Sequence, residues 1–167
     1  MVSAIESRRS VRKYKQDGPV TRQQLDGLLH AAMLAPSARN SRPWEFIVIT
    51  KREILDKIES VHPNANMLKT AAAAIVVVAS PQSGIAEGYY PQDCGAATQN
   101  ILLEATGMGL GSCWCGVYPN EDRVASISRI LNIEKPKIPF NVIAIGVPDE
   151  APAQRGFFEA ERVTYIE

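Results

Sequence analysis

Apolar residues recur along the chain with two different spacings, which separate expected helices from expected strands. Between Thr21 and Pro36 the apolar positions fall three or four residues apart, as on one face of a helix, and Gln24 completes a capping box with Thr21. From Ala71 to Ala79 the run is continuous and β-branched, as in a strand buried on both faces. The same criteria predict helices over 4–9, 51–61, 64–69, 93–106 and 120–131, and strands over 46–49, 140–147 and 163–166.

Composition limits the class of protein. At 167 residues with 46% hydrophobic content, the chain can bury one good core, so we expect a single domain over 1–167. No run of 18 apolar residues and no secretory signal are present, which predicts a cytoplasmic protein without a membrane partner. The formal net charge of zero argues against nucleic-acid binding. The 3 cysteines and 2 histidines have no zinc-ligand spacing, so no metal site is expected.

Positive charge is concentrated near the N-terminus. Five of the eighteen lysines and arginines lie between positions 8 and 15, although acidic and basic residues are equal in number. Arginine matches a phosphate group with a rigid fork of donors, and a serine hydroxyl among arginines can add a further hydrogen bond. The cluster formed by Arg8, Arg9, Ser10 and Arg12 therefore predicts an anion site. The alternative is a solvated basic arm.

A second polar stretch joins the helix over 21–36 to the strand over 46–49. It contains Pro36, Ser37, Asn40 and Pro43, so two prolines stiffen a loop that carries short hydrogen-bonding side chains. Judged alone, this stretch is equally consistent with an ordinary connection between a helix and a strand.

The glycine-rich segment 107–116 resembles a dinucleotide-binding fingerprint only superficially. That fingerprint follows a strand and opens a helix, whereas these glycines close the helix over 93–106 and lead into a strand. The position of the third glycine is Ser112. No serine or cysteine nucleophile is paired with a histidine and an acid, so a hydrolytic triad is not expected, and no catalytic side chain is predicted.

Four features of the chain together resemble the FMN-dependent nitroreductase family, and they occur in the family's order over nearly the whole chain. They are Arg-Arg-Ser-x-Arg, Pro-Ser-x-x-Asn-x-x-Pro-Trp, Gly-Leu-Gly-Ser-x-Trp and a later arginine. The resemblance implies an α+β fold, with a central mixed β-sheet flanked by helices in a three-layer sandwich. It also implies an intertwined homodimer with FMN at the interface, in which the C-terminal arm 149–167 is exchanged with the partner. The chain would be a short member, because the helical insertion of larger members is missing near 80–92.

The resemblance also assigns roles to residues of this chain. The first motif and Arg155 would hold the FMN phosphate and ribityl chain, and the proline-bounded loop would lie along the flavin ring. Backbone N–H groups after Cys115 would face flavin N5, and Asn66 would reach the flavin from the segment before the strand over 71–79. For the backbone positions a plain strand end remains the alternative. The expected cofactor-binding residues are Arg8, Arg9, Ser10, Arg12, Pro36, Ser37, Ala38, Asn40, Asn66, Cys115, Gly116, Val117, Tyr118 and Arg155.

The expected activity is an oxidoreductase with a ping-pong mechanism. NADH or NADPH would pass hydride to FMN, and a small acceptor such as a nitroaromatic or a quinone would then be reduced by two electrons. Two alternatives stay open: a flavin enzyme of the same fold with different chemistry, and a non-catalytic protein that binds or senses FMN.

Overall fold

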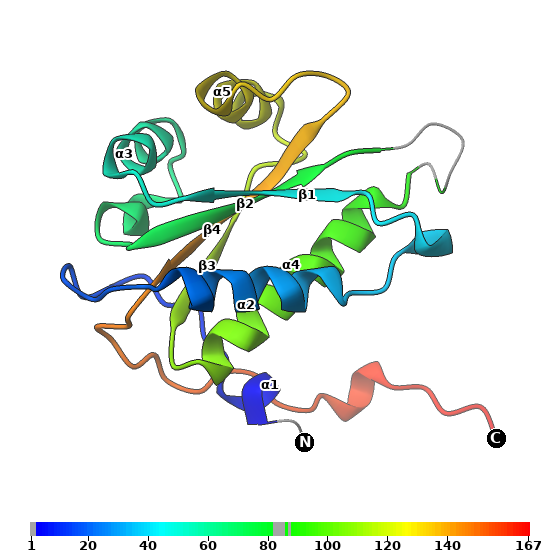
Figure 1. The fold of residues 1–167 in the computed structure, drawn as a ribbon. Helices are drawn as coiled ribbons and strands as arrows, with labels where there is room; N and C mark the ends of the chain where they lie inside the picture. Colours follow the sequence, from blue (N-terminus) through cyan, green and yellow to red (C-terminus); the bar gives the residue numbers. More distant parts are fainter. Residues whose placement is uncertain (1–2, 82–85, 87) are drawn as a thin grey trace.

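Four strands form one sheet in the computed structural model, which describes residues 3–81, 86 and 88–167 (Figure 1). The strands are β1 (Trp44–Ile49), β2 (Ala73–Ala79), β3 (Gly111–Gly116) and β4 (Ile138–Gly146), in the order β1-β2-β4-β3. The α-helices are α1 (Ser3–Ser7), α2 (Arg22–Met33), α3 (Arg52–Val61), α4 (Tyr90–Gly107) and α5 (Glu121–Leu131).

The sheet lies between two layers of helices, with α3 and α5 on one face and α2 and α4 on the other (Figure 1). Strand β2 explains the two helix layers, because its side chains point alternately to the two faces of the sheet and contribute to a hydrophobic core on each face. Val76 packs in the core with Leu55 and Ile127, whereas Ile75 packs in the core with Leu28. All residues of β2 are buried, as the continuous apolar run predicted. The predicted α+β three-layer arrangement is confirmed.

The expected mixed sheet is wrong for the part of the chain that the structure describes, because all three strand pairs are antiparallel. The only parallel pairing there is an isolated bridge between Ser10 and Ser112. The segment 163–166, which was expected to add a strand to a second subunit, pairs with no strand among the described residues of its own chain, and Tyr165 and Ile166 are exposed.

The N-terminal segment leaves its helix earlier than predicted. Helix α1 ends at Ser7 instead of residue 9, because the following residues extend along the sheet and the Val11 N–H donates to Ser112 O at 3.0 Å. Gly111 permits this approach, since a Cβ there would lie 2.8 Å from Val11 Cγ1. Packing against β3 therefore carries the arginine motif to the end of the sheet.

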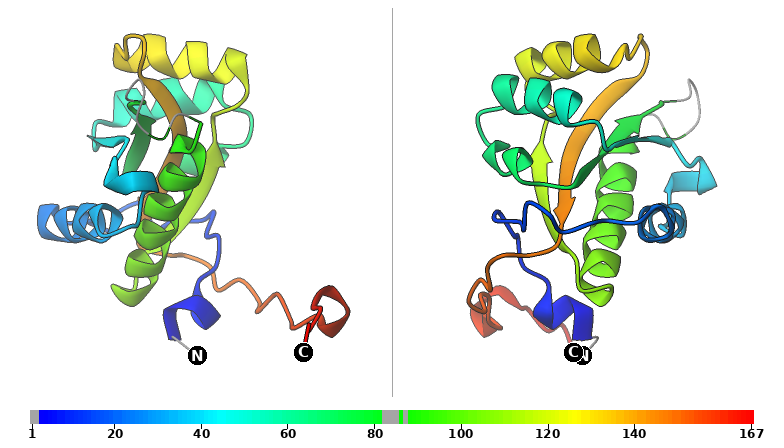
Figure 2. Two further views of the ribbon diagram at one scale, coloured as in Figure 1. Left: turned by 90° about the vertical axis from the view of Figure 1, so that its right-hand side faces the viewer. Right: turned by 60° about the vertical axis from the view of Figure 1, so that its left-hand side comes forward.

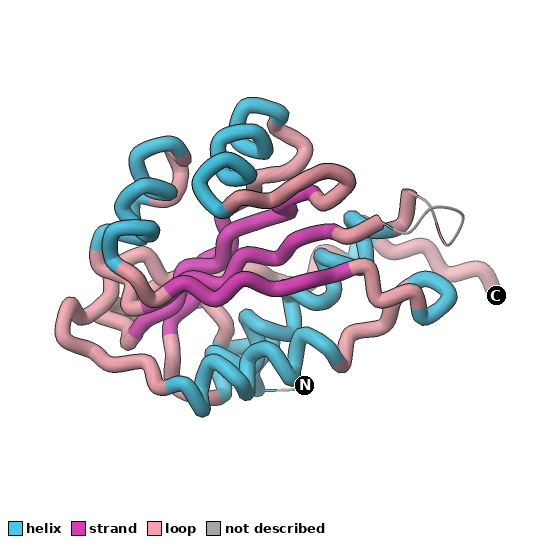
Figure 3. Tube along the Cα trace, turned by 45° about the horizontal axis from the view of Figure 1, so that its top comes forward, coloured by secondary structure: helices cyan, strands magenta, loops and turns pink. Residues whose placement is uncertain are grey.

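Most element boundaries agree with the pattern of the sequence (Figure 3). The capping box of Thr21 and Gln24 is present at the start of α2. Helix α4 begins at Tyr90, earlier than expected, because Pro91 is tolerated in a first helical turn. The predicted helix over 64–69 is a 3-10 helix at Asn66–Lys69. Residues 82–85 and 87 of the short connection over 80–92 lie outside the described residues.

Both termini lie on one side of the molecule, and the tail passes close to α1 before it extends away (Figure 2). Phe157, Phe158, Tyr165 and Ile166 in this tail are each at least 76% exposed. None of the described helices is both long enough and apolar enough to cross a membrane.

Candidate functional site

A small cationic cavity of about 360 Å³ forms where the N-terminal motif meets the start of the tail. Arg155 comes from the far end of the sequence to join the four residues of the motif. This arrangement places four arginines around one volume, which suits an anion with several oxygen acceptors. The lining residues are Arg8, Arg9, Ser10, Arg12, Glu150, Pro152, Ala153 and Arg155.

Hydrogen bonds fasten the two ends of the chain at this cavity. One carboxylate oxygen of Glu150 accepts from the Arg12 N–H at 2.5 Å and from the Lys13 N–H at 3.2 Å. Arg9 Nε donates to Ala153 O at 3.1 Å. Arg9 is thus a structural link, whereas Arg8 and Arg155 side chains have no hydrogen-bond or ion-pair partner among the described residues. Sequence reasoning missed Glu150, because no local signal connects residues 138 positions apart.

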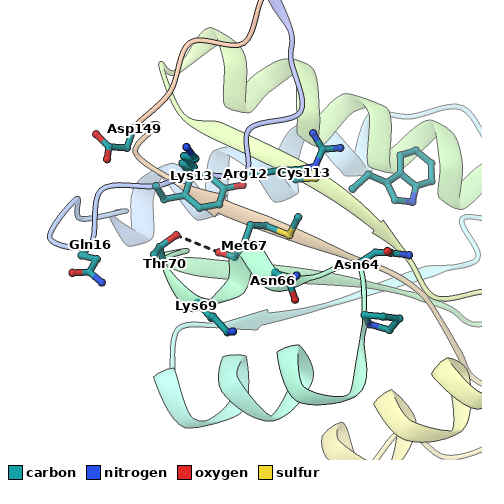
Figure 4. Close-up of a pocket in the computed structure, with 13 residues that line it drawn as sticks. Arg12, Lys13, Gln16, Asn64, Asn66, Met67, Lys69, Thr70, Cys113 and Asp149 are labelled. Carbon is teal, nitrogen blue, oxygen red and sulfur yellow. Dashed lines mark hydrogen bonds between the residues drawn. The ribbon is translucent and has the colours of Figure 1, made fainter.

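A larger cavity of about 910 Å³ shares Arg12 with the small one (Figure 4). Asn66, one of the expected cofactor-binding residues, lines it. Lys13 and Lys69 also line it, so cations outnumber the single acidic residue, Asp149. The sequence offered a signal for Lys69, which lies one turn after Asn66 on the same 3-10 helix. The full lining is Arg12, Lys13, Tyr14, Gln16, Pro63, Asn64, Asn66, Met67, Lys69, Thr70, Cys113, Trp114 and Asp149.

The outer edge of β3 borders this cavity, and strand register decides which of its backbone groups are available. The Val117 N–H donates to Phe140 O at 3.2 Å, so Val117 directs its N–H toward β4. In antiparallel ladders such residues alternate with residues whose N–H and C=O groups point away from the partner strand. Gly116 and Trp114 therefore direct their backbone groups outward, and the Gly116 N–H has no hydrogen bond among the described residues.

This register corrects part of the predicted backbone site. Val117 and Tyr118 were expected to turn their N–H groups toward a cofactor together with Gly116. Both instead donate to Phe140 O, at 3.2 and 3.0 Å, and the Val117 side chain is buried. Only Gly116 retains an available donor at the predicted position.

The carbonyl of Gly116 is held by two side-chain donors. His62 Nε2 lies 2.9 Å from Gly116 O, and Arg123 Nη1 donates to the same oxygen at 3.1 Å. Burial lowers the pKa of His62, an effect that the hydrogen bond to Gly116 partly opposes. The imidazole is therefore expected to be neutral. Sequence reasoning set both histidines aside because neither had a catalytic partner nearby in the sequence.

Sulfur atoms pack beneath the β3 edge. The predicted residue Cys115 is 2% exposed, and its Sγ lies 3.5 Å from Met67 Sδ, so its side chain belongs to the core. Cys113 lies beside the cavity. Its interaction with the Cys115 thiol lowers the pKa of Cys113 to about 7, with smaller contributions from Arg12 and Arg8. No cluster of three or more His, Cys, Asp or Glu residues within 3–81, 86 and 88–167 could hold a metal ion.

The predicted loop of Pro36, Ser37, Ala38 and Asn40 does not join this site. It lies across the molecule from the arginine motif (Figures 1 and 2), and none of these residues lines either cavity. Its conformation is nevertheless well defined, since the Ala38 N–H donates to Asp93 Oδ1 at 3.0 Å and the Arg42 N–H donates to Ser37 Oγ at 3.0 Å.

Backbone strain marks the same loop. Arg39, Asn40 and Arg42 have φ values of 52°, 54° and 47°. Such conformations are costly for residues other than glycine and tend to occur at functional sites. One chain thus brings the arginine motif and Arg155 to one cavity, and Asn66 and Trp114 to a neighbouring cavity that shares Arg12, whereas the strained loop lies elsewhere.

Comparisons with known proteins agree with this architecture. The model of the nitroreductase family matches residues 5–62 and 59–147. A Methanothermobacter thermautotrophicus protein, provisionally named NADH dehydrogenase/NAD(P)H nitroreductase, is 47% identical over 98% of this chain and 85% of its own length.

Two solved structures share the fold over almost their whole length. One from Clostridium acetobutylicum, provisionally named an NADH oxidase, has a TM-score of 0.93 and 40% identity, covering 99% of both chains. An FMN-dependent nitroreductase from Clostridium difficile has a TM-score of 0.91 and 30% identity, covering 100% of this chain and 99% of its own. By sequence and by fold, the chain belongs to the nitroreductase family.

Proposed function

We propose that this chain is an oxidoreductase that binds FMN and uses NADH or NADPH to reduce small acceptors, with nitroaromatics and quinones as the expected class. The observation that carries the proposal is a pair of neighbouring cavities that share Arg12, the larger of which is lined on β3 by Cys113 and Trp114. The related Clostridium difficile protein, named as FMN-dependent, supports the choice of cofactor.

The small cavity fits the phosphate end of FMN. Arg8, Arg12 and Arg155 supply charged donors, and Ser10 adds a hydroxyl. Charge-assisted hydrogen bonds of this kind are the stronger ones in proteins. Arg9 would contribute indirectly by holding the tail in place through Ala153 O.

The larger cavity fits the remainder of the cofactor. Asn66 and Lys69 lie on one wall of the cavity, and the outward edge of β3 lies on another. FMN, when bound, supplies reversible two-electron chemistry between a nicotinamide donor and a second acceptor. An N–H donor fixed at Gly116 would stabilise the negative charge that develops on reduction, without a side chain that titrates. Exchange of donor for acceptor in one pocket corresponds to the expected ping-pong order.

Two features favour a homodimer with a shared site. The strained loop over 36–42 lines neither of the two cavities described above, and the tail exposes large apolar residues. Exposed apolar residues grouped on one segment are typical of an interaction surface. In the proposed dimer, Ser37 and Asn40 would approach the flavin of the partner, and the 149–167 arm would pack on the partner with Phe157 and Phe158 as anchors.

The first test is the visible spectrum of the purified protein after reconstitution with FMN. We expect a bound-flavin spectrum that bleaches on anaerobic addition of NADH or NADPH and recovers on addition of a quinone. Bound flavin that stays oxidised with both donors would favour a binding or sensing protein. No bound flavin would contradict the assignment of the cofactor.

A matched pair of variants tests the backbone donor. Gly116→Pro removes the N–H, whereas Gly116→Ala keeps it, and a Cβ at this position meets no atom within 4 Å. Loss of one preorganised donor to developing charge typically costs about 100-fold in rate. We expect a loss of this size in the rate of flavin reduction for the proline variant and little change for the alanine variant. Equal rates in both variants would remove Gly116 from the mechanism.

A further inference from the structure

We propose that His62 is a positioning residue that acts together with Arg123 to hold the Gly116 peptide at the β3 edge. His62 is 1% exposed and lies just after α3, distant in sequence from β3. The proposal concerns this chain's own residues. It rests on the proposed function only in taking the ligand that meets the Gly116 N–H to be FMN.

The hydrogen bonds of His62 define its tautomer. The Asn64 N–H donates to His62 Nδ1 at 3.3 Å, so this nitrogen is the acceptor. In a neutral imidazole the other nitrogen then carries the proton. His62 Nε2 therefore donates to Gly116 O, where Arg123 Nη1 is the second donor. Both lone pairs of this carbonyl are thereby satisfied.

Gly116 has no side chain whose packing could help the β3–β4 ladder to orient it. Glycine has the widest conformational freedom of any residue, and here the space around its Cβ position is open to 4 Å. Side-chain packing therefore cannot fix the direction of its peptide groups. On the outer edge of β3 the two hydrogen bonds to its carbonyl act with the Val117 N–H bond to Phe140 O to hold the Gly116–Val117 peptide, and the Gly116 N–H, on the preceding peptide, stays available as a donor.

The same imidazole connects two walls of the larger cavity. Pro63 and Asn64, which follow His62 directly, line the cavity on one wall. Trp114, the preceding outward-facing residue of β3, lines it on another. A change at His62 is therefore expected to alter the relative position of these walls without removing any group that contacts the ligand.

Three substitutions separate the two hydrogen bonds of His62. A glutamine amide reaches approximately as far as Nε2, so His62→Gln keeps a donor toward Gly116 O. An asparagine reaches only as far as Nδ1, so His62→Asn keeps the local acceptor for Asn64 and loses the long-range donor. His62→Leu loses both. Arg123→Leu removes the second donor from a position nearer the surface, where the fold should tolerate the change.

The first readout uses the protein without cofactor. Hydrogen exchange of the Val117 amide reports on the Gly116–Val117 peptide, because this N–H is bonded to Phe140 O. We expect exchange at least about tenfold faster in His62→Asn, His62→Leu and Arg123→Leu, and a nearly unchanged rate in His62→Gln. Asn100→Leu is the control, since it removes a side-chain bond to Ala31 O between α4 and α2.

The second readout is the two-electron midpoint potential of the FMN-loaded protein, which a purely structural role would leave unchanged. If the hydrogen bonds from His62 and Arg123 orient the Gly116 donor, loss of either bond should shift the equilibrium away from reduced flavin by about tenfold. The midpoint potential would then be about 30 mV more negative. His62→Gln should restore the wild-type potential.

The outcomes distinguish the two proposals. Wild-type potential and wild-type Val117 exchange in folded His62→Asn and Arg123→Leu would overturn the positioning role. A wild-type protein that binds no FMN would overturn the proposed function instead, and the exchange rates would still decide whether His62 holds Gly116.

Discussion

The arginine motif and the loop over 36–42, the two motifs noted near the start of the sequence, have different surroundings in the folded chain. The arginine motif meets Arg155, Glu150 and the larger cavity within one molecule. The loop over 36–42 is also held by hydrogen bonds, yet it lies on the other side of the molecule and lines neither of these two cavities. Both motifs resemble parts of a single flavin site.

This difference shows that residues assigned to one functional site can lie far apart within a single chain. The arginine motif is held by hydrogen bonds to residues of its own tail, whereas the hydrogen bonds of the loop among the described residues go to Asp93 and within the loop itself. Its three left-handed residues retain a conformation that the loop alone would not favour. We interpret the arginine motif as part of a site in its own chain, and the loop over 36–42 as part of the site in the partner subunit of a homodimer.

Removal of the arginine motif should have the largest effect. Arg8→Ala combined with Arg12→Ala deletes two charged donors, each of which typically contributes about 1.5–3 kcal/mol to binding an anion. FMN affinity, measured by flavin fluorescence titration, should fall at least about 100-fold while the protein stays folded. Arg22→Ala with Arg129→Ala is the control for total charge. Retention of full affinity would show that the cluster is only a basic arm.

Mixed dimers should separate the two motifs. One protomer would carry Arg8→Ala and Arg12→Ala, and the other Ser37→Ala and Asn40→Ala. If the loop serves the partner, random reassociation should restore about one quarter of the sites, because half of the dimers would each contain one intact site. Reductase activity after mixing measures this recovery. No recovery, from homodimers that exchange freely, would mean that both motifs act on one site in the same chain.

Loosening the loop should have a smaller effect. Asp93→Leu leaves the partly buried N–H of Ala38 without its acceptor, which should reduce the free energy of unfolding by about 1–3 kcal/mol. Asp93→Asn, which keeps an acceptor, should stay near wild type, and FMN phosphate binding should be unaffected in both. Urea denaturation and flavin titration check the two parts. A large loss of FMN affinity with Asp93→Leu would contradict our inference that the loop does not contribute to phosphate binding.

The smallest expected effect is on the pH dependence of stability. It arises from His62, which lies in the part of the proposed site formed within one chain. Burial lowers the pKa of folded His62 from its ordinary 6.5, so below about pH 6.5 the unfolded chain takes up a proton that the folded chain does not. Stability from this group is fully present above pH 6.5 and should decline as pH falls toward the folded pKa. Thermal unfolding from pH 8 to pH 5 should show a steeper decline in wild type than in His62→Gln. Parallel declines would contradict the buried neutral imidazole.

Much of the local structure could be predicted from the sequence because its causes are local. The capping box of Thr21 and Gln24 and the buried β2 run depend on spacing within one segment. The arginine motif was also visible, since like charges so close together are unusual in a chain without net charge.

Relations between distant segments were decided only by the tertiary structure. The register of β3 against β4 turns the Gly116 N–H outward and engages Val117 with Phe140 O, and a shift by one residue would reverse the two. Glu150 and His62 reach their backbone partners across 138 and 54 positions of sequence. Such contacts follow from how elements pack, which no single stretch encodes. The sequence by itself therefore determined which residues can bind an anion and where helices and strands form, and packing decided which of those groups meet.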